Sequence, residues 1–474
     1  MRGASLMVLR TLVLYPIGFA GEVGLARFLS PQDFGVYGIA SFATVTLSAV
    51  MEVGLAAALI QRPEEASDEE YQTIFTLQVL IVSALVLLFF AFSPWVFPVL
   101  KLDPGVRWTL LVLLACPWIS SFATVSSVKL ERALRYPVFA KMDVLRGITY
   151  VGMALPLAYL GAGHWSFVAA ILASTVVKAA VAFHAAPWPV RFRLRVSGMG
   201  GTLRFGALFQ LSTLTSLVRD HIAVVLGGPL YGAQAVGYLN WAKNTTYYSS
   251  QIFTQVVSRV VFPSISRVQQ EPEAVGHMTE TVFKYVNLFT LPIILLFTSL
   301  IPEFVAVVFT NKWSPAIPAF YFYSLRMVGS NVTTLFISVL NGLGRIRTSL
   351  RVLIWWTALD WALALVLCPF MGFTGIAAAY GISVIPVSVW LLLELRTYAP
   401  IRLRASFIMP LACSSVVAIA VWVVKSRWDP TWLVVVTLAG MGGACYLLLL
   451  WLLERRTLLS EGRTFLRAVL AREL

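Results

Sequence analysis

Residues 350–394 read LRVLIWWTALDWALALVLCPFMGFTGIAAAYGISVIPVSVWLLLE, two long apolar runs joined by a short turn. A helix needs about twenty mostly apolar residues to cross the hydrocarbon core of a bilayer, and each run supplies that length. The turn between them, from Met371 to Thr374, has room only for a hairpin. The stretch therefore predicts two antiparallel membrane-spanning helices, over 350–370 and 374–394.

The rest of the chain repeats this pattern of long apolar runs separated by short polar gaps. Together with the two runs above, they give about fourteen predicted spans, each close to the length that a crossing needs. The others lie at 5–28, 34–60, 72–94, 107–128, 144–161, 164–184, 205–227, 235–262, 282–309, 315–342, 406–424 and 431–452. The runs are continuous, whereas the strands of a membrane barrel alternate apolar and polar residues over about ten positions. We therefore expect an all-α integral membrane protein with no large domain outside the bilayer.

The composition indicates that lipid is the solvent of this chain. Of its 474 residues, 59% are hydrophobic and 12% are charged, and the mean hydropathy is +0.81. A soluble domain carries about a quarter charged residues. The formal net charge of +14 comes from basic residues in the gaps between apolar runs, not from one face of a polar domain, which argues against a nucleic-acid partner. The four cysteines, Cys116, Cys368, Cys413 and Cys445, have no metal-binding spacing, so we expect no metal, disulfide or cofactor.

Lysine and arginine are distributed unevenly between the two ends of the spans. One side carries Lys129, Arg132, Arg135, Lys141, Arg146, Arg191, Arg193, Arg195, Arg204, Arg345, Arg347, Arg351, Arg396, Arg402, Arg404, Arg455, Arg456, Arg463, Arg467 and Arg472. The other side holds Arg27, Lys101, Arg107, Lys312, Lys425 and Arg427. Because Lys and Arg resist translocation, the richer side is predicted to face the cytoplasm, with both termini on it.

Two short segments resemble each other at an offset of 202 residues. Ser30-Pro31-Gln32-Asp33-Phe34-Gly35 joins the first two spans, and Gly232-Ala233-Gln234-Ala235-Val236-Gly237 joins the seventh and eighth, with Gly35 and Gly237 in register. The offset equals six spans, and a repeat of even span number keeps its orientation in the membrane. We therefore predict two six-helix lobes related by a pseudo-two-fold axis along the membrane normal, over 1–190 and 191–395. The remaining residues, 396–474, would add two helices and a cytoplasmic tail.

Several motifs carry a resemblance to a known family. Residues 25–35, LARFLSPQDFG, resemble the first loop of polysaccharide-exporting flippases of the MATE-like superfamily, and residues 52–62, EVGLAAALIQR, resemble the end of their second span. The stretch NKWSPA at 311–316 is similar to the family's Gly-x-Lys-Trp loop, with Asn311 in place of the usual small residue. Asp220, followed by VVLG at 224–227, resembles the pattern of the seventh span. The likeness extends over nearly the whole chain.

The resemblance implies both a fold and a function. It implies fourteen helices in two lobes that move undecaprenyl-diphosphate-linked oligosaccharides from the cytoplasmic to the outer leaflet of a bacterial inner membrane by alternating access. The implied partners are this lipid-linked sugar and membrane lipid, with a polysaccharide polymerase or ligase as a candidate neighbour. The branch that flips lipid II keeps extra arginines in its first helix, whereas residues 14–20 contain none here.

Ionisable residues in the middle of predicted spans are candidates for the transport site, because a charge in the bilayer usually faces a wet cavity and a partner. Arg219, Lys243 and Arg326 are the cations, and arginine matches phosphate oxygens well. We hypothesise that these three line the wall of the second lobe and receive the diphosphate or acidic sugars. In the alternative interpretation, Arg219 pairs with Asp220 or Asp360 only to hold helices together.

The acidic residues within spans are Glu22, Glu52, Asp220 and Asp360. A carboxylate in a cavity of low dielectric constant takes up a proton more readily, so these residues are candidates either for ion coupling or for helix pairing. Glu52 lies within the Glu-Val-Gly-Leu motif, where a structural role is equally compatible with the sequence.

Two other function classes compete with this hypothesis. An enzyme of membrane-linked sugars needs a cluster of catalytic groups, but the four histidines are scattered and no glycine-rich phosphate loop follows a strand, so we assign no catalytic residues. A cation-coupled multidrug exporter or a lipid II flippase of the same fold is the nearer alternative. A drug exporter favours mid-span acidic residues, whereas cations are comparably numerous here, which favours an anionic substrate.

Overall fold

The computed structural model describes residues 2–52, 67–99, 104–133, 135–194, 220–248, 261, 264–401 and 404–470. Within these ranges every regular element is a helix, as the sequence predicts. Eight of the helices described are long and apolar enough to cross a membrane: Asp68–Trp95, Gly105–Arg132, Trp165–Ala185, Pro272–Phe309, Ile346–Met371, Thr374–Leu395, Ser406–Lys425 and Trp432–Leu453. The chain is therefore a multi-span membrane protein.

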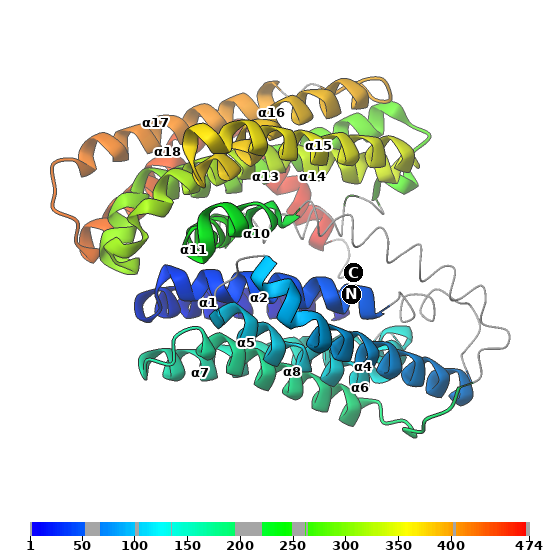
Figure 1. Cartoon of the computed structure of the whole chain (residues 1–474). Helices are drawn as coiled ribbons and strands as arrows, with labels where there is room; N and C mark the ends of the chain where they lie inside the picture. Colours follow the sequence, from blue (N-terminus) through cyan, green and yellow to red (C-terminus); the bar gives the residue numbers. More distant parts are fainter. Residues whose placement is uncertain are drawn as a thin grey trace. The chain divides into compact units, whose positions relative to one another are not determined.

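The chain divides into two compact units, Met1–Trp241 with Met371–Ile376, and Ala242–Phe370 with Ala377–Leu474. Helices α1 (Arg2–Phe28), α2 (Pro31–Glu52), α4 (Asp68–Val99), α5 (Pro104–Leu113), α6 (Ala115–Arg132), α7 (Tyr136–Tyr159), α8 (Trp165–Ala185) and α10 (Ile222–Val225) belong to the first unit. The first part of α11 (Gly227–Tyr248) also belongs to it. Figure 1 shows that α4, α6, α7 and α8 run side by side within this unit.

Helix α7 begins earlier than the hydropathy pattern predicts. The apolar run starts at residue 144, whereas the helix starts at Tyr136, with Pro137 in its first turn, where a missing N–H costs nothing. The two additional turns include Lys141 and Asp143, which the hydropathy pattern leaves outside the predicted span. As a consequence Arg146, which the sequence predicts at the cytoplasmic end of the span over 144–161, lies well inside a helix that packs against both α1 and α8.

The Ser-Pro-Gln-Asp motif forms the N-terminal cap of α2. The Asp33 carboxylate accepts hydrogen bonds from the Ser30 backbone N–H (2.9 Å) and hydroxyl (2.6 Å), and the Ser30 hydroxyl accepts one from the Asp33 N–H (3.2 Å). This reciprocal arrangement is a capping box that satisfies exposed N–H groups at a helix start. The other carboxylate oxygen of Asp33 accepts from the His164 N–H (2.9 Å), so the cap also fixes the turn between α7 and α8.

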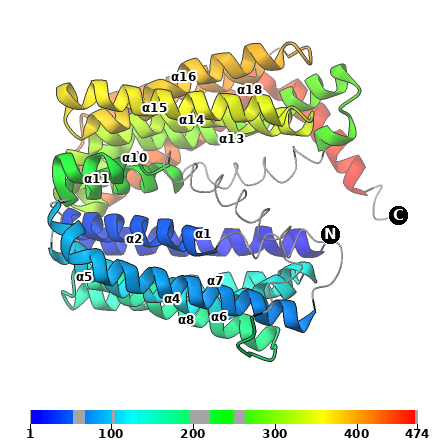
Figure 2. The same ribbon diagram turned by 45° about the vertical axis from the view of Figure 1, so that its right-hand side comes forward.

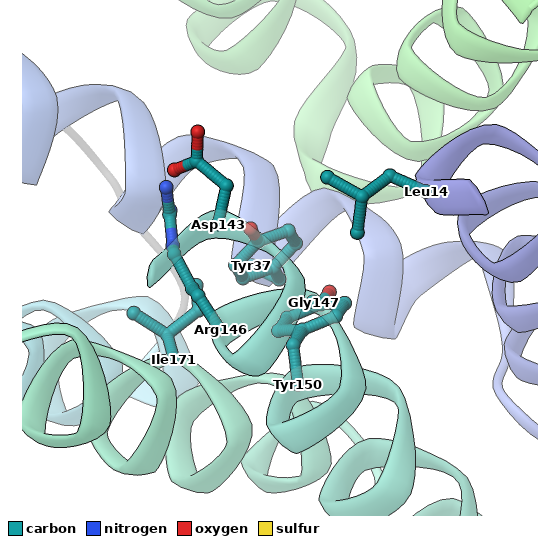
Figure 3. Close-up of a pocket in the computed structure, with 7 residues that line it drawn as sticks. All are labelled: Leu14, Tyr37, Asp143, Arg146, Gly147, Tyr150 and Ile171. Carbon is teal, nitrogen blue, oxygen red and sulfur yellow. The ribbon is translucent and has the colours of Figure 1, made fainter. Parts of the chain in front are cut away.

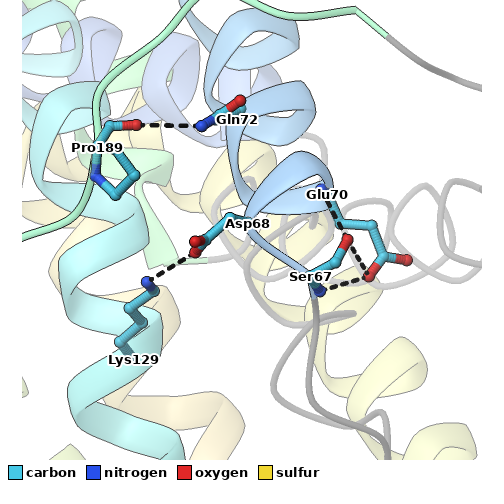
Figure 4. A network of polar contacts seen from close by, with 6 residues as sticks. All are labelled: Ser67, Asp68, Glu70, Gln72, Lys129 and Pro189. Carbon is cyan, nitrogen blue, oxygen red and sulfur yellow. Dashed lines mark hydrogen bonds and ion pairs between the residues drawn. The ribbon is translucent and has the colours of Figure 1, made fainter.

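The segment that follows α8 is bound to the first turns of α4 (Figure 4). Gln72 donates to the Pro189 carbonyl (3.4 Å), and Asp68 pairs with Lys129 of α6 (3.5 Å). The Trp188 ring is buried against Phe75, with 5.1 Å between ring centroids. These contacts fix the exit of the chain from the helices of the first unit.

The second unit contains the later helices. They are α13 (Pro272–Phe304), α14 (Ile317–Gly342), α15 (Ile346–Met371), α16 (Thr374–Leu395), α17 (Met409–Lys425) and α18 (Trp432–Leu470), with the π-helical turns η1 (Val305–Phe309) and η3 (Arg404–Ile408) and the 3₁₀ turn η2 (Asn311–Ala316). Figure 2 shows α13, α14, α15 and α16 running side by side.

Two polar contacts attach the last helices to α13. The Lys425 ammonium of α17 pairs with Glu303 (2.9 Å) and donates to the Ser299 carbonyl (2.6 Å). The Tyr446 hydroxyl of α18 donates to the Leu288 carbonyl (2.8 Å). Polar contacts of this kind are a normal means of joining helices in lipid, where burial of apolar surface gives little driving force. Helices α17 and α18 are therefore an integral part of the second unit.

Candidate functional site

A cavity of about 490 Å³ lies in the first unit (Figure 3). It is lined by Leu14 of α1, Tyr37 of α2, Ile171 of α8, and Asp143, Arg146, Gly147 and Tyr150 of α7. Four of these seven side chains are polar or charged, which is unusual for the interior of a membrane helix bundle. The cavity is therefore the first candidate for a transport site.

Arg146 is the cation of this cavity. It stands about 15 Å along the axis from the start of α7, near the middle of the helix, and its side chain is exposed. In Figure 3, Arg146 and Asp143, one turn apart on α7, extend to the same side. An exposed guanidinium that lines a cavity is open to water and to a ligand.

Tyr37 lies at the centre of the polar groups. The side chains of Ser41 and Tyr150 lie close to its hydroxyl, and the charges of Glu22 and Arg146 are close enough to act on it. Its ring stacks on Phe167, with 4.3 Å between centroids and 14° between planes. The stack fixes the ring, and with it the position of the phenol group. The sequence candidate Glu22 therefore lies near the cavity, with a charge opposite to that of Arg146.

The site combines hydrogen-bond donors with a carboxylate, because Asp143 lines the same cavity as Arg146. A guanidinium group offers five N–H donors in a planar fork, and the hydroxyls of Tyr37 and Tyr150 add two groups that donate or accept. No group of three His, Cys, Asp or Glu able to hold a metal ion occurs among the residues that the structure describes.

A second charged cluster lies in the second unit around Arg326 of α14. Its guanidinium pairs with Asp360 of α15 (3.6 Å) and donates to the Tyr380 carbonyl of α16 (3.3 Å). The group also lies 4.8 Å from the centroid of the Trp356 ring and 4.5 Å from that of Tyr380. The Arg326 side chain is 15% exposed and that of Asp360 is 0% exposed, so this is an ion pair in the interior of the unit.

Asp360 is held from its other side as well. Its second carboxylate oxygen accepts a short hydrogen bond from the Ser383 hydroxyl of α16, and that hydroxyl accepts one from the Trp356 indole N–H (3.2 Å). The cluster therefore links α14, α15 and α16 through groups that are largely satisfied by protein. Both roles that the sequence leaves open for Asp360, ion coupling and helix pairing, remain predictions.

The sequence model for polysaccharide biosynthesis proteins matches residues 24–318. The chain belongs to this family. It is 21% identical over 346 residues to the lipopolysaccharide biosynthesis protein WzxC of Escherichia coli, covering 70% of this chain and 68% of WzxC. It is 24% identical over 371 residues to the succinoglycan biosynthesis transport protein ExoT of Rhizobium meliloti, covering 77% and 72%.

The fold comparison agrees with the family. The structure superposes on the lipid II flippase MurJ in its inward closed conformation with a TM-score of 0.77 at 14% identity, covering 94% of this chain and 98% of that one. At this identity the likeness shows a common fold alone. The resemblance to the polysaccharide-exporting flippases is thus confirmed, and the protein is a membrane transporter of the polysaccharide biosynthesis family.

The structure places the sequence candidates in different surroundings. Arg326 and Asp360 are brought together, and Glu22 lies near the cavity of the first unit. Lys243 of α11 is partly exposed, as is Asp220, the residue two positions before α10. Glu52 is the last residue of α2 and its side chain is not described, whereas Arg219 lies outside the described residues.

The sequence analysis missed four polar residues of the cavity: Tyr37, Asp143, Arg146 and Tyr150. A signal for three of them exists. Asp143, Arg146 and Tyr150 have the spacing i, i+3, i+7, which places them on one face of a helix. The hydropathy pattern does not reveal this face. A helix with two charged residues near its start has the same hydropathy profile as a shorter helix that begins after those residues.

Proposed function

We propose that this protein flips an oligosaccharide carried on undecaprenyl diphosphate from the cytoplasmic to the outer leaflet of the bacterial plasma membrane. The observation that carries the proposal is Arg146, an exposed arginine at the middle of α7 that lines a cavity with two tyrosines. A diphosphate cannot enter hydrocarbon unless its negative charge is neutralised. An arginine side chain donates two parallel hydrogen bonds to phosphate oxygens. The names of WzxC and ExoT, which connect them with surface polysaccharides, support the same substrate class.

The transport cycle proposed here is alternating access by the two lobes, 1–190 and 191–395, with both termini in the cytoplasm. Arg146 receives the diphosphate or an acidic sugar in the first lobe, and Tyr37 and Tyr150 contact hydroxyls of the sugar. Lys243 and Arg219 add positive charge from the second lobe. Arg326 contributes to this positive charge only indirectly, because its guanidinium forms an ion pair with Asp360. Glu22 and Glu52 are the candidates for ion coupling, and a polysaccharide polymerase or ligase would take up the product.

The test is a flipping assay in proteoliposomes that contain the purified protein and a fluorescent undecaprenyl-diphosphate oligosaccharide. We expect protein-dependent appearance of the sugar in the far leaflet, strongly reduced in Arg146→Ala and retained in Arg347→Ala, a matched exposed arginine on α15. Absence of flipping for several sugars, together with uptake of a cationic dye driven by a proton gradient, would replace the proposal with a drug exporter. Flipping of lipid II in preference to these sugars would move the protein to the peptidoglycan branch.

A further inference from the structure

Residues 187–194 follow α8 and lie along the first turns of α4 without helical structure of their own (Figure 4). Two prolines in the first three residues of this segment prevent α8 from continuing into it. The Trp188 side chain is buried, and the Arg193 backbone N–H donates to the Thr76 hydroxyl of α4 (2.9 Å). The Arg193 guanidinium also pairs with Glu69 (2.7 Å). The segment is therefore held in a fixed position on the first unit.

The last five residues of the segment alternate apolar and basic side chains. They are Val190, Arg191, Phe192, Arg193 and Leu194. The three apolar residues are 40%, 68% and 56% exposed, in chain order, so the part of the chain that the structure describes leaves them largely uncovered. Neighbouring apolar groups that are uncovered and bordered by charge are typical of a surface that meets a membrane or a protein partner.

The height of the segment along α4 distinguishes between these two partners. The span Asp68–Trp95 has 28 residues and is about 42 Å long, whereas the hydrocarbon core of a bilayer is about 30 Å thick. The excess of roughly 12 Å belongs to the start of α4, because all of its charged residues lie in its first turn. Thr76, which holds Arg193, lies about 12 Å along the axis from that start. We therefore expect the segment at the boundary between headgroups and hydrocarbon, where lipid is the available partner.

The basic groups near this boundary differ in their partners. Arg193 is paired with Glu69, as described above. Lys129 of α6 pairs with Asp68 (3.5 Å). Arg191 is exposed, and within the described ranges no carboxylate pairs with it. An unpaired guanidinium beside uncovered apolar groups has the chemistry of an interfacial anchor, in which the apolar groups enter the lipid and the cation stays at the phosphates.

We propose that residues 190–194 bind the membrane surface through an anionic phospholipid. The three apolar side chains lie among the first carbons of the acyl chains, and the Arg191 guanidinium contacts the phosphate of the headgroup. Anionic phospholipids match this site, because they attract basic groups close to the surface. The surface shares no residue with the cavity of the first unit, and the inference does not depend on the substrate proposed above.

Nitroxide labelling tests where the side chains of the segment lie. The Cys445→Ala background removes the exposed native cysteine and leaves three that are buried. A single cysteine at position 190, 191, 192 or 194 then carries the label in bilayers that contain phosphatidylglycerol. We expect labels at the three apolar positions to collide several-fold more often with oxygen, which concentrates in lipid, than with a water-soluble nickel chelate. The label at Arg191→Cys should show the reverse preference.

The lipid reference for these collisions is Leu80→Cys, a 52% exposed position farther along α4. Frequent collisions with the nickel chelate at all four positions would place the segment in water. Rare collisions with both reagents at the apolar positions would show that protein covers them, either a partner or a second copy of this chain. Each of these two results would overturn the proposal.

A fluorescent label at Phe192→Cys tests the preference for an anionic headgroup. Lipids with brominated acyl chains quench the label when they are adjacent to it. We expect brominated phosphatidylglycerol to quench it about twofold more than brominated phosphatidylethanolamine at the same mole fraction. This preference should disappear when Arg191→Gln is added and should remain when Arg427→Gln, an exposed arginine that follows α17, is added instead.

Two results of the quenching experiment would overturn the proposed occupant. Equal preference with and without Arg191→Gln would show that the guanidinium does not select the headgroup. Loss of quenching on addition of a small amount of undecaprenyl diphosphate would assign the surface to the lipid carrier of the substrate. Both the nitroxide and the quenching measurements are made without flipping, so a failure of the proposed function would leave their outcome unchanged.

Discussion

Arg146 and Arg326 are two arginines within long helices, and their surroundings differ. Each lies roughly 15 Å along the axis from the start of its helix, so this distance does not distinguish them. Arg146 is exposed and lines a cavity of about 490 Å³ in the first unit. Arg326 is enclosed by a carboxylate, a carbonyl and two aromatic rings in the second unit, with 15% of its side chain exposed.

We expect the partners of such a charge, rather than its position along a helix, to decide what it does. The charge of Arg326 is balanced by Asp360, and its contacts join three helices, so its removal affects folding first. Arg146 lines a cavity of about 490 Å³, so we expect its removal to affect binding first. We therefore expect substitutions of Arg326 to lower stability and substitutions of Arg146 to lower transport. Single substitutions at each position test this difference.

The largest effect is expected from breaking the ion pair of the second unit. Asp360→Ala leaves the Arg326 guanidinium buried without its counter-charge, and loss of one partner of a buried pair costs about 3–5 kcal/mol in the free energy of unfolding. We expect a large drop in the thermal unfolding midpoint in detergent and low abundance in membranes. The double variant Arg326→Met/Asp360→Leu replaces both charges with apolar groups of similar size, and we expect it to recover most of the stability.

Two results would contradict this interpretation of Arg326. A stable Asp360→Ala protein would show that the pair contributes little to folding. A double variant that is stable and abundant but no longer flips substrate would give Arg326 a direct role in transport, as the sequence hypothesis has it. Abundance and unfolding midpoint must accordingly be measured on the same samples as flipping.

The sequence predicts the fold better than the site, for a physical reason. The span over 374–394 is a helix over Thr374–Leu395, because a long apolar run has few other ways to satisfy its backbone in lipid. Arg326 and Asp360 are recognised from the sequence because charged residues are rare in long apolar runs. Their pairing, however, depends on how α14 and α15 are rotated about their axes, which a single sequence does not show. Arg146 was missed because charges near the end of a run are indistinguishable by hydropathy from charges in the next loop.

A smaller effect, confined to transport, is expected at Arg146. Hydrogen bonds to charged groups contribute about 1.5–3 kcal/mol, so Arg146→Ala should reduce flipping by roughly 10- to 100-fold. The unfolding midpoint should change little, because the side chain is exposed and substitutions at such positions are usually within about 0.5 kcal/mol. Arg146→Lys should keep part of the activity, since it retains the charge but not the planar fork. A large loss of stability in Arg146→Ala would show that Arg146, like Arg326, contributes to folding, and would contradict the proposed difference between the two arginines.

The smallest effect expected is at Tyr37, and it tests whether the cavity recognises sugar as well as phosphate. Tyr37→Phe removes the hydroxyl that contacts Ser41 and Tyr150 but keeps the ring that stacks on Phe167. One neutral hydrogen bond contributes about 1 kcal/mol, so we expect flipping to fall roughly fivefold, with Tyr159→Phe, a 74% exposed tyrosine, as the unaffected control. If the loss is the same for oligosaccharide and for undecaprenyl diphosphate alone, the phenol serves the phosphate or the position of Arg146. A loss limited to the oligosaccharide assigns it to the sugar, because only the sugar supplies further hydroxyls for it to contact.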